Sequence, residues 1–200
     1  MKKVKTIDEV IEFIKDDMTI AVGGFIGVGT PEKLIDAIVK KGVKNITLIA
    51  NDTSTPTTGV GKLVVNKCCK KVIVSHIGTN AETQRQMNEK ELEVELVPQG
   101  TLIERIRAAG AGLGGVLTPT GIGTIVEEGK QKLEIQGKEY LLELPLKADV
   151  ALLLGGIVDK KGNCYFNKAT RNFNPIIATA ADLVIVQAES LASELFPENP

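Results

Sequence analysis

The sequence is poor in the residues that build disulfide frameworks and metal sites. Its 200 residues include three cysteines, Cys68, Cys69 and Cys164, and one histidine, His76. An odd number of cysteines, two of them adjacent, does not suit a disulfide framework. The CxxC or CxxH spacing of a zinc site is also absent. We therefore expect no metal, and thiols that behave as small hydrophobic groups.

Net charge and long apolar runs are lacking as well. The 24 lysines and arginines nearly balance 25 aspartates and glutamates, which gives a formal net charge of −1. Such a chain has no field that attracts a nucleic acid. No stretch approaches the ~18 uncharged apolar residues of a membrane span, and residues 1–14 lack the apolar run of a signal peptide. The sequence predicts a cytoplasmic protein without a nucleic-acid or membrane partner.

What the sequence does contain is an alternation of short apolar segments with amphipathic ones. Thr6 and Glu9 form a capping box that starts a first helix. We expect the strands and helices to follow one another along the chain, with a hairpin around Gln136 and Gly137. The expected strands cover residues 19–25, 46–50, 72–76, 92–97, 150–154 and 183–186, the helices 31–41, 60–66, 81–90 and 102–109, and the hairpin 131–144.

This alternation indicates the fold class. Strands with two apolar faces, separated by helices, are typical of a mostly parallel sheet that is covered on both sides. The sequence therefore predicts an α/β fold with a small hairpin insertion. No linker, fixed-period repeat or low-complexity tract divides the chain, so we expect residues 1–200 to form one domain.

Four loops lie where ligands bind in such folds, at the carboxyl ends of the strands. They cover residues 23–31, 51–53, 75–80 and 98–101. The first is rich in glycine and leads into a helix whose N–H groups could receive an anion. A dinucleotide fingerprint fails there, because the third position of GxGxxG is Glu32, and the GxGxxG at 110–115 follows a helix. The loop is therefore either a tight strand-to-helix turn or a ligand cradle.

Three polar residues in these loops are candidates for a site. His76 lacks a GxSxG partner motif and neighbours Ser75 in a strand, which favours a structural or pocket-lining histidine over a general base. Gln99 and Asn51 are neutral amides at strand ends, and each can donate to a carboxylate or an oxyanion. Taken alone, each amide is more often a capping or loop residue.

Together the loops resemble the A (α) subunit of the class I CoA-transferases, the 3-oxoacid, acetate and butyrate group. The likeness extends over about residues 6–188 and rests on segments that occur in the same order as in that family. These segments are Asp17-Met18-Thr19, Gly23-Gly24-Phe25, Gly29-Thr30-Pro31, Ser75-His76-Ile77-Gly78-Thr79-Asn80, Glu95-Leu96-Val97-Pro98-Gln99-Gly100-Thr101, Glu104-Arg105-Ile106-Arg107-Ala108, Leu117-Thr118-Pro119-Thr120-Gly121 and Asn172-Phe173-Asn174-Pro175.

The resemblance implies an enzyme that moves CoA between an acyl-CoA and a free carboxylate by a ping-pong reaction. In the family a glutamate attacks the thioester, and it belongs to a Ser-Glu-Asn-Gly motif of the B subunit. This chain lacks that motif, since Glu198-Asn199 is followed by Pro200. The resemblance thus implies a hetero-oligomer, αβ or α₂β₂, with a B subunit that supplies the nucleophile.

The same resemblance assigns the site residues. It implies coenzyme A binding at Gly24, Phe25, Ile26, Gly27, Val28, Gly29 and Thr30, with Phe25 against the acyl chain. It also implies that Gln99 donates to the developing oxyanion and that Asn51 holds the substrate carboxylate.

One part of the chain departs from the family pattern, and the sequence leaves two alternative functions. After Glu189 family members continue through a Pro-Gly-containing tail, whereas this chain runs Ser190 to Pro200; we expect any consequence at the contact with the B subunit. A metabolite-sensing domain on a related α/β scaffold is the main alternative function, because fold does not fix function. A dinucleotide-dependent enzyme is the other, and the failed fingerprint disfavours it.

Overall fold

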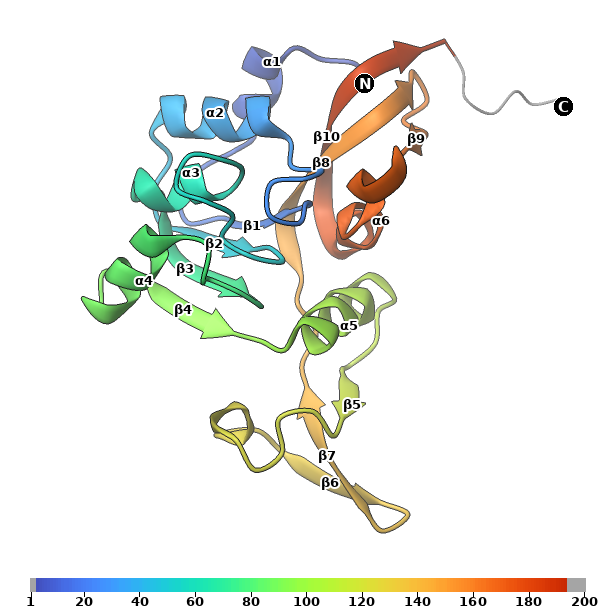
Figure 1. The fold of residues 1–200 in the computed structure, drawn as a ribbon. Coiled ribbons are helices and arrows are strands. Elements are labelled where there is room, and N and C mark those ends of the chain that lie inside the picture. Colours follow the sequence, from blue (N-terminus) through green and yellow to red (C-terminus); the bar gives the residue numbers. More distant parts are fainter. Residues whose placement is uncertain (1–2, 194–200) are drawn as a thin grey trace, which may run out of the picture.

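The computed structural model describes residues 3–193 and shows a main sheet of seven strands (Figure 1). Six strands run parallel in the order β10-β8-β1-β2-β3-β4, and β9 pairs antiparallel with β8. Their bounds are β1 Thr19–Val22, β2 Ile46–Ile49, β3 Cys69–Val74, β4 Glu93–Leu96, β8 Ala148–Asp159, β9 Cys164–Tyr165 and β10 Ala181–Ala192. The α/β fold with a mostly parallel sheet is confirmed.

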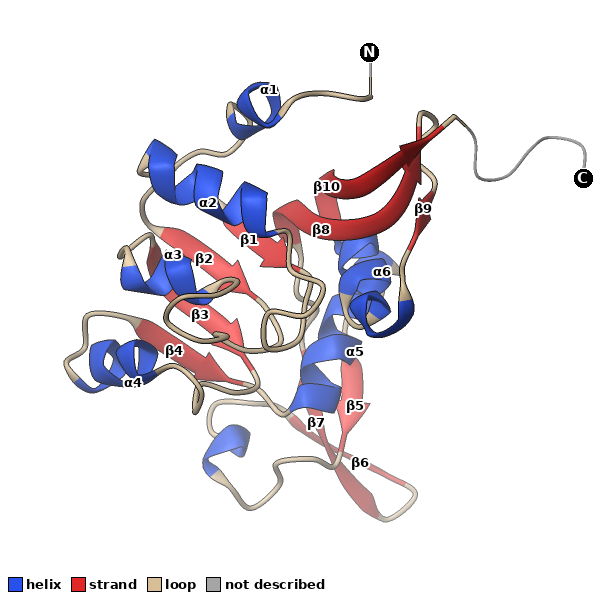
Figure 2. Ribbon diagram, turned by 45° about the horizontal axis from the view of Figure 1, so that its top comes forward, coloured by secondary structure: helices blue, strands red, loops and turns tan. Residues whose placement is uncertain are grey.

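Helices cover both faces of this sheet (Figure 2). Helices α1 to α4 lie along one face, and α5 and α6 lie along the other. The helices are α1 Ile7–Ile11, α2 Glu32–Lys41, α3 Gly61–Val65, α4 Ala81–Asn88, α5 Gln99–Gly110 and α6 Asn174–Ile177, with 3₁₀ turns at Ile125–Glu127, Lys168–Arg171 and Ala178–Ala180. Within residues 3–193, no helix has the length and apolar character needed to cross a membrane.

The alternation of side chains along the strands explains why both faces are covered. In β1, Ile20 and Val22 pack in the core under α1 to α4, whereas Ala21 packs in the core under α5 and α6. In β3, Val72 and Ile73 divide between the same two cores. Because successive side chains of a strand point to opposite faces, a strand that is apolar throughout must be buried on both.

A second, three-stranded sheet extends away from the main sheet (Figure 1). Its antiparallel order is β5-β7-β6, with bounds β5 Val116–Thr118, β6 Lys132–Ile135 and β7 Lys138–Glu143. The predicted hairpin is confirmed, since Gln136 and Gly137 form its two-residue turn with φ values of 54° and 74°. Positive φ at both central residues is typical of the type I′ turn. Strand β5, which adds the third strand, was not predicted.

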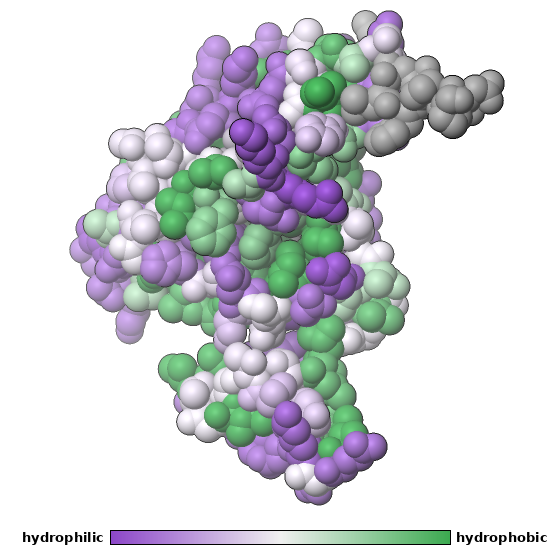
Figure 3. Space-filling view, turned by 45° about the vertical axis from the view of Figure 1, so that its right-hand side comes forward, coloured by the Kyte–Doolittle hydropathy of each residue, from purple (hydrophilic) through white to green (hydrophobic). Residues whose placement is uncertain are grey.

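The surface of this extension mixes apolar and polar side chains. Figure 3 shows green, hydrophobic patches on it beside purple, hydrophilic ones. Leu117, Ile125 and Ile135 are exposed there, whereas Leu141 of β7 is fully buried. The extension therefore presents apolar side chains to solvent although it also buries part of its own apolar surface.

The expected elements are present, but several bounds differ. The capping box of Thr6 and Glu9 begins α1, and Gly42 ends α2 in the left-handed region, with φ 76°. Helix α5 begins at Gln99 instead of Leu102. Strands β8 and β10 each run for twelve residues and pair along most of that length, well beyond the expected strands. The departure predicted after Glu189 lies mostly outside the described residues, because residues 194–200 are not among them.

Candidate functional site

The candidate site lies at the carboxyl edge of the main sheet. The glycine-rich loop follows β1, the loop from Asn51 follows β2, the loop from Ser75 follows β3, and Gln99 begins the helix after β4. The sheet order places β1 between β8 and β2. The strands that follow β1 in the sequence therefore lie on both sides of it, with β2, β3 and β4 on one side and β8 and β10 on the other. Such a switch point is where ligands bind in open α/β sheets.

The glycine-rich loop projects as a small hairpin. Phe25 and Val28 exchange backbone hydrogen bonds of 2.9 and 3.0 Å, and Ile26 and Gly27 form the turn with φ values of 47° and 84°. Phe25, Ile26 and Val28 are 43%, 42% and 50% exposed. Large apolar side chains at the tip of a well-defined turn form a surface that suits an apolar ligand or a partner chain.

Two asparagines at the start of α6 and just before it hold this loop in place. The Asn174 side chain donates to the carbonyl of Gly29 at 3.0 Å and accepts from the N–H of Leu154 at 3.2 Å, and Asn174 is fully buried. The Asn172 side chain donates to the carbonyl of Val28 at 2.9 Å. The Asn172–Pro175 segment of the family resemblance is therefore the support of the glycine-rich loop.

The glycines of the loop are required by close packing. A Cβ on Gly23 would lie 1.9 Å from Oδ1 of Asn174, and a Cβ on Gly24 would lie 2.1 Å from Oγ1 of Thr30. Gly24 also has a φ of 129°, which L-residues rarely adopt. The backbone thus approaches its supports more closely than any side chain would permit.

The start of α2 does not offer the free N–H groups that the sequence suggested for an anion. The Gln187 side chain, on β10, accepts hydrogen bonds from the N–H groups of Lys33 at 2.9 Å and Leu34 at 3.3 Å. The N–H of Glu32 donates to the carbonyl of Thr30 at 2.9 Å. Because these donors are already paired, an anion at this helix would have to displace them, and that part of the prediction is wrong.

Gln99 and Asn51 meet at the centre of the edge. Nε2 of Gln99 donates to Oδ1 of Asn51 at 2.7 Å, and Oγ of Ser75 donates to the backbone carbonyl of Asn51 at 2.7 Å. Asn51 is 2% exposed, whereas Gln99 is exposed. The structure therefore unites the two amides, with Asn51 as the buried support and Gln99 as the group that faces solvent.

A buried carboxylate braces this pair. Oδ2 of Asp52 accepts hydrogen bonds from Nδ2 of Asn51 at 2.7 Å and from the N–H of Ile26 at 2.8 Å, and Oδ1 accepts from the N–H of Ser54 at 2.7 Å. Asp52 is 4% exposed. It joins the glycine-rich loop to the loop after β2, so one side chain sets the geometry of both.

The loop after β3 also helps to hold the loop after β2 in place. Asn80 caps α4 through the N–H groups of Glu82 and Thr83 and donates to the carbonyl of Thr53 at 2.9 Å. His76 is exposed and pairs with Asp52 only as an isolated backbone bridge. No hydrogen bond within residues 3–193 joins the His76 side chain to Ser75, Asn51 or Gln99.

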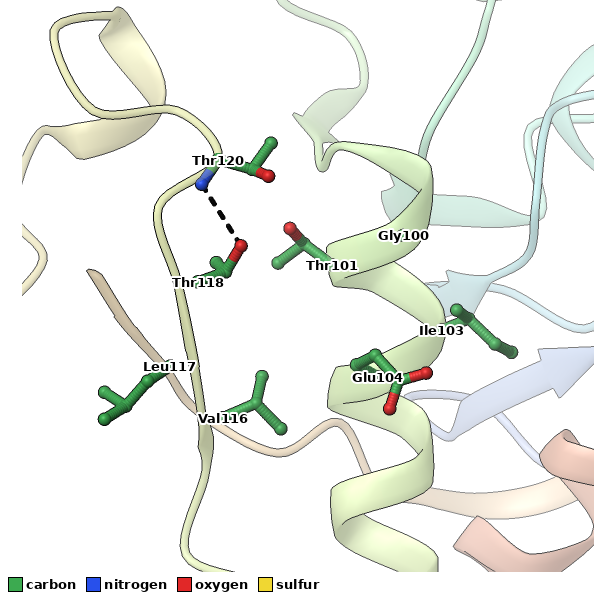
Figure 4. Close-up of a pocket in the computed structure, with 8 residues that line it drawn as sticks. All are labelled: Gly100, Thr101, Ile103, Glu104, Val116, Leu117, Thr118 and Thr120. Atoms are coloured by element: carbon green, nitrogen blue, oxygen red, sulfur yellow. Dashed lines mark hydrogen bonds between the residues drawn. The ribbon is translucent and has the colours of Figure 1, made fainter. Parts of the chain in front are cut away.

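Two hollows flank the exposed face of α5. The larger, about 520 Å³, lies between α5 and β5, and Figure 4 shows its lining residues. The smaller, about 310 Å³, lies between α5 and the segment from Asn172 to Ile176, and Gln99 lines it. Gly100 and Ile103 line both hollows. The first turn of α5 therefore separates two spaces that open beside the candidate site.

The three cysteine thiols do not provide an activated nucleophile. Burial raises the pKa of all three thiols, Cys68, Cys69 and Cys164, which keeps them protonated. No cluster of three or more histidine, cysteine, aspartate or glutamate side chains in residues 3–193 is arranged to hold a metal ion. The residues at this edge instead provide oriented, neutral hydrogen-bond donors beside the hollows that flank α5.

Sequence reasoning missed the residues that position this set. The side chains of Asp52 and Asn174 each bond to more than one segment of the chain, and the side chain of Gln187 joins β10 to the start of α2. The sequence gives a weak indication of the roles of Asp52 and Asn174. Asp52 is a polar residue beside a buried strand, and Asn174 lies within one of the family segments. The sequence gives no indication for Gln187, because only the pairing of β10 with β8 brings it to the start of α2.

Known proteins resemble this chain over most of its length. The family model described as "Coenzyme A transferase" matches residues 4–199. The chain is 56% identical over 191 residues to the acetoacetyl-CoA:acetate/butyrate CoA transferase alpha subunit of Clostridium acetobutylicum, covering 96% of this chain and 88% of that protein. It is 54% identical over 199 residues to the acetate CoA-transferase subunit alpha of Escherichia coli, covering 98% and 90%.

A solved structure shows the same fold at low sequence identity. An acyl-CoA transferase from Escherichia coli, in a thioester complex with CoA, superposes with a TM-score of 0.84 at 21% identity. The match covers 98% of this chain and 43% of that one. At this identity the likeness establishes the architecture alone.

Proposed function

Because this chain belongs to the coenzyme A transferase family, we propose that it is the α subunit of a short-chain acyl-CoA:carboxylate CoA-transferase. The substrates are an acyl-CoA and a free acid of the acetate, acetoacetate and butyrate type. Two relatives that are more than half identical over nearly the whole chain have names of this kind. We also propose that the protein is cytoplasmic, and this part of the proposal rests on the sequence.

The observation that carries the proposal is the oriented amide of Gln99, held by Asn51 at 2.7 Å beside open space. A thioester carbonyl develops negative charge on oxygen when a carboxylate attacks its carbon. A fixed N–H donor stabilises that charge without prior reorganisation. The contact to Asn51 uses one N–H of the Gln99 amide, which leaves the second N–H to serve as this donor.

The nucleophile in this proposal is a glutamate of the B subunit. Its carboxylate attacks the thioester carbon and releases CoA thiolate, which leaves a mixed anhydride. The thiolate then attacks the glutamyl carbonyl, and the acid leaves as its carboxylate. An acceptor carboxylate reverses these steps and takes the CoA, so each bond broken is matched by one formed.

The remaining residues of the edge position the substrates. We assign the CoA and acyl contacts to the loop from Gly24 to Thr30, whose apolar tip of Phe25, Ile26 and Val28 is exposed. Asn51 is buried and bonded to Asp52, Gln99 and Ser75. This geometry supports a role in orienting Gln99 at least as much as the direct contact with the substrate carboxylate that the sequence suggested.

A reconstitution assay tests the proposal. The purified chain, the B subunit and their mixture are each supplied with acetoacetyl-CoA and acetate, and acetyl-CoA is measured. We expect transfer from the mixture and none above background from either chain alone. Full transferase activity from this chain alone, or none from the assembled mixture with any short-chain acid, would contradict the proposal.

A further inference from the structure

The buried carboxylate of Asp52 holds two strained turns at the candidate site. Its Oδ2 accepts from the N–H of Ile26 at 2.8 Å, and its Oδ1 accepts from the N–H of Ser54 at 2.7 Å. Both residues have a positive φ, 47° for Ile26 and 52° for Ser54. Such values are unfavourable for residues other than glycine, above all for a β-branched one, and they persist only where surrounding contacts impose them. Asp52 is therefore one of the contacts that keep both turns in these conformations.

The same carboxylate determines which way the Asn51 amide is turned. The oxygen and the nitrogen of an amide are similar in size, so hydrogen-bond partners must distinguish them. Within residues 3–193, the Asn51 side chain is bonded to the side chains of Asp52, Ser75 and Gln99. The hydroxyl of Ser75 and the amide of Gln99 can each donate or accept, whereas an ionised carboxylate can only accept. Asp52 therefore requires Nδ2 of Asn51 to face it, at 2.7 Å.

The orientation of Asn51 in turn determines that of Gln99. Because Nδ2 of Asn51 is directed at Asp52, Oδ1 of Asn51 faces Gln99 and accepts from its Nε2 at 2.7 Å. If the Asn51 amide were inverted, its nitrogen would face Gln99, and the Gln99 amide would turn to present its oxygen. The N–H groups of Gln99 would then leave the position in which the proposed reaction needs a donor.

A chain of hydrogen bonds thus leads from a buried charge to an exposed donor. Hydrogen bonds to an ionised acceptor are roughly twice as strong as neutral ones, and successive bonds in a chain polarise one another. Three donors surround the Asp52 carboxylate, so its charge is compensated where it lies. Asp52 is 4% exposed, and its influence on the Gln99 donor passes through Asn51.

We propose that Asp52 is a positioning residue of the transferase reaction, which sets the orientation of the Gln99 amide through Asn51 and holds the glycine-rich loop through the N–H of Ile26. The inference rests on the proposed function, because it concerns the oxyanion donor of that reaction. One side chain then keeps this donor and the loop assigned to CoA in a fixed relation. Its effect on kcat passes through Gln99, and its effect on the KM for acyl-CoA passes through the loop.

A double-mutant cycle in the assembled complex with the B subunit tests this route. Asp52→Asn keeps the shape of the side chain and replaces a group that only accepts with an amide. With acetoacetyl-CoA and acetate as substrates, we expect kcat to fall about tenfold and the KM for acetoacetyl-CoA to rise several-fold. In the Gln99→Ala background, the same substitution should change kcat by less than about twofold and still raise the KM.

Side-chain NMR follows the Gln99 amide directly and does not depend on turnover. The glutamine side chains of this chain are isotope-labelled in the assembled complex, and the Gln99 signals are those missing from Gln99→Ala. In the unaltered complex we expect one amide proton to exchange slowly with solvent, because it is bonded to Asn51. Asp52→Asn should abolish this slow exchange. If Asp52→Asn does not assemble, Asn51→Ala interrupts the same chain of bonds and should abolish it as well.

Asp159→Asn is the matched control. Asp159 is 2% exposed and accepts from the N–H groups of Lys161 and Asn163 and from Nδ2 of Asn163, so its partners are of the same kinds as those of Asp52. It ends β8, well beyond Leu152, which pairs with the last residue of β1. Its substitution should lower the free energy of unfolding and leave kcat, KM and the glutamine signals unchanged.

Two results would overturn the inference. A fall in kcat that is equally large with and without Gln99 would show that Asp52 does not act through that amide. Slow exchange of the Gln99 proton that persists in Asp52→Asn, or in Asn51→Ala where that variant replaces it, would show that this chain of bonds does not orient the amide. An unaltered complex without transferase activity would count against the proposed function instead, because the NMR measurement tests the chain of bonds separately.

Discussion

The side-chain amides of Gln99 and Asn51, 48 positions apart in the sequence, are joined by a hydrogen bond of 2.7 Å. This bond connects the start of α5 to the end of β2. Because Asn51 is itself held by Asp52 and Ser75, the orientation of the exposed Gln99 amide is set before any substrate arrives. Preorganised donors of this kind are the main source of charge stabilisation in acyl transfer.

Removing the amide of Gln99 should therefore slow the reaction. We expect Gln99→Ala to lower kcat by about 10²–10³ in the assembled enzyme, because the developing oxyanion loses a fixed donor. Steady-state kinetics with acetoacetyl-CoA and acetate provide the measurement. Gln131→Ala, at an exposed glutamine beside the small sheet, should leave kcat unchanged. Unchanged turnover in Gln99→Ala would remove this role from Gln99.

The support of the glycine-rich loop should be sensitive to the loss of Asn174. Asn174→Ala leaves the N–H of Leu154 and the carbonyls of Gly29 and Thr170 without their side-chain partner. We expect the free energy of unfolding to fall by about 3 kcal/mol. Urea unfolding measures it, and the KM for acyl-CoA should rise in parallel. Asn66→Ala, at an exposed helix end, should cost less than about 1 kcal/mol. Equal losses in the two variants would argue against the special role of Asn174.

A methyl group on Gly24 should not be tolerated. Gly24 has a φ of 129°, and an added Cβ would lie 2.1 Å from Oγ1 of Thr30. Backbone strain and steric overlap together should lower the free energy of unfolding by at least about 2 kcal/mol in Gly24→Ala. Gly114→Ala is the matched control, because a Cβ there meets nothing within 4 Å and its φ is not in the left-handed region. Thermal unfolding that is equal in both variants would contradict the close packing of Gly24 against Thr30.

The pH dependence of stability should report on Glu95. Burial raises the pKa of this carboxyl, but hydrogen bonds from Arg105 and Lys71 outweigh burial and hold the pKa below its ordinary value. A lowered pKa in the folded state gives stability that is present above the unfolded pKa of about 4.3 and is lost as pH falls through the folded value. Glu95→Gln should therefore reduce the loss of stability below about pH 4.3.

Urea unfolding between neutral and acidic pH measures this difference. Glu134→Gln, at an exposed carboxylate of β6, should keep the pH profile of the unaltered chain. An acid limb that is just as steep in Glu95→Gln would show that the contacts with Arg105 and Lys71 add no pH-dependent stability.

The layered fold could be predicted because its signals are local. Runs such as Ile46–Ile49 and the capping residue Thr6 specify their elements through apolar periodicity and hydrogen bonding within a few residues. The start of α5 could not be predicted in this way, because Gln99, Gly100 and Thr101 carry little helical preference as a group. Pro98 nevertheless starts the helix there, and Gln99 becomes both a helix residue and a site residue.

The candidate site was only partly visible in the sequence for a similar reason. Gln99 and Asn51 could be named because neutral amides at strand ends suit the chemistry and match a family pattern. Their contact could not, because it depends on β2, β3 and β4 lying side by side. Gln187 reaches the start of α2 through sheet pairing between distant strands, and no local pattern encodes such pairing.

The central claim is that the attacking glutamate lies on another polypeptide, and intact-mass spectrometry tests it most directly. The assembled complex is incubated with acetoacetyl-CoA without an acceptor acid, and both chains are weighed after rapid denaturation. We expect the mass of the B subunit to increase by a covalently attached CoA while the mass of this chain does not change. A CoA adduct on this chain, with an unmodified B subunit, would contradict the claim.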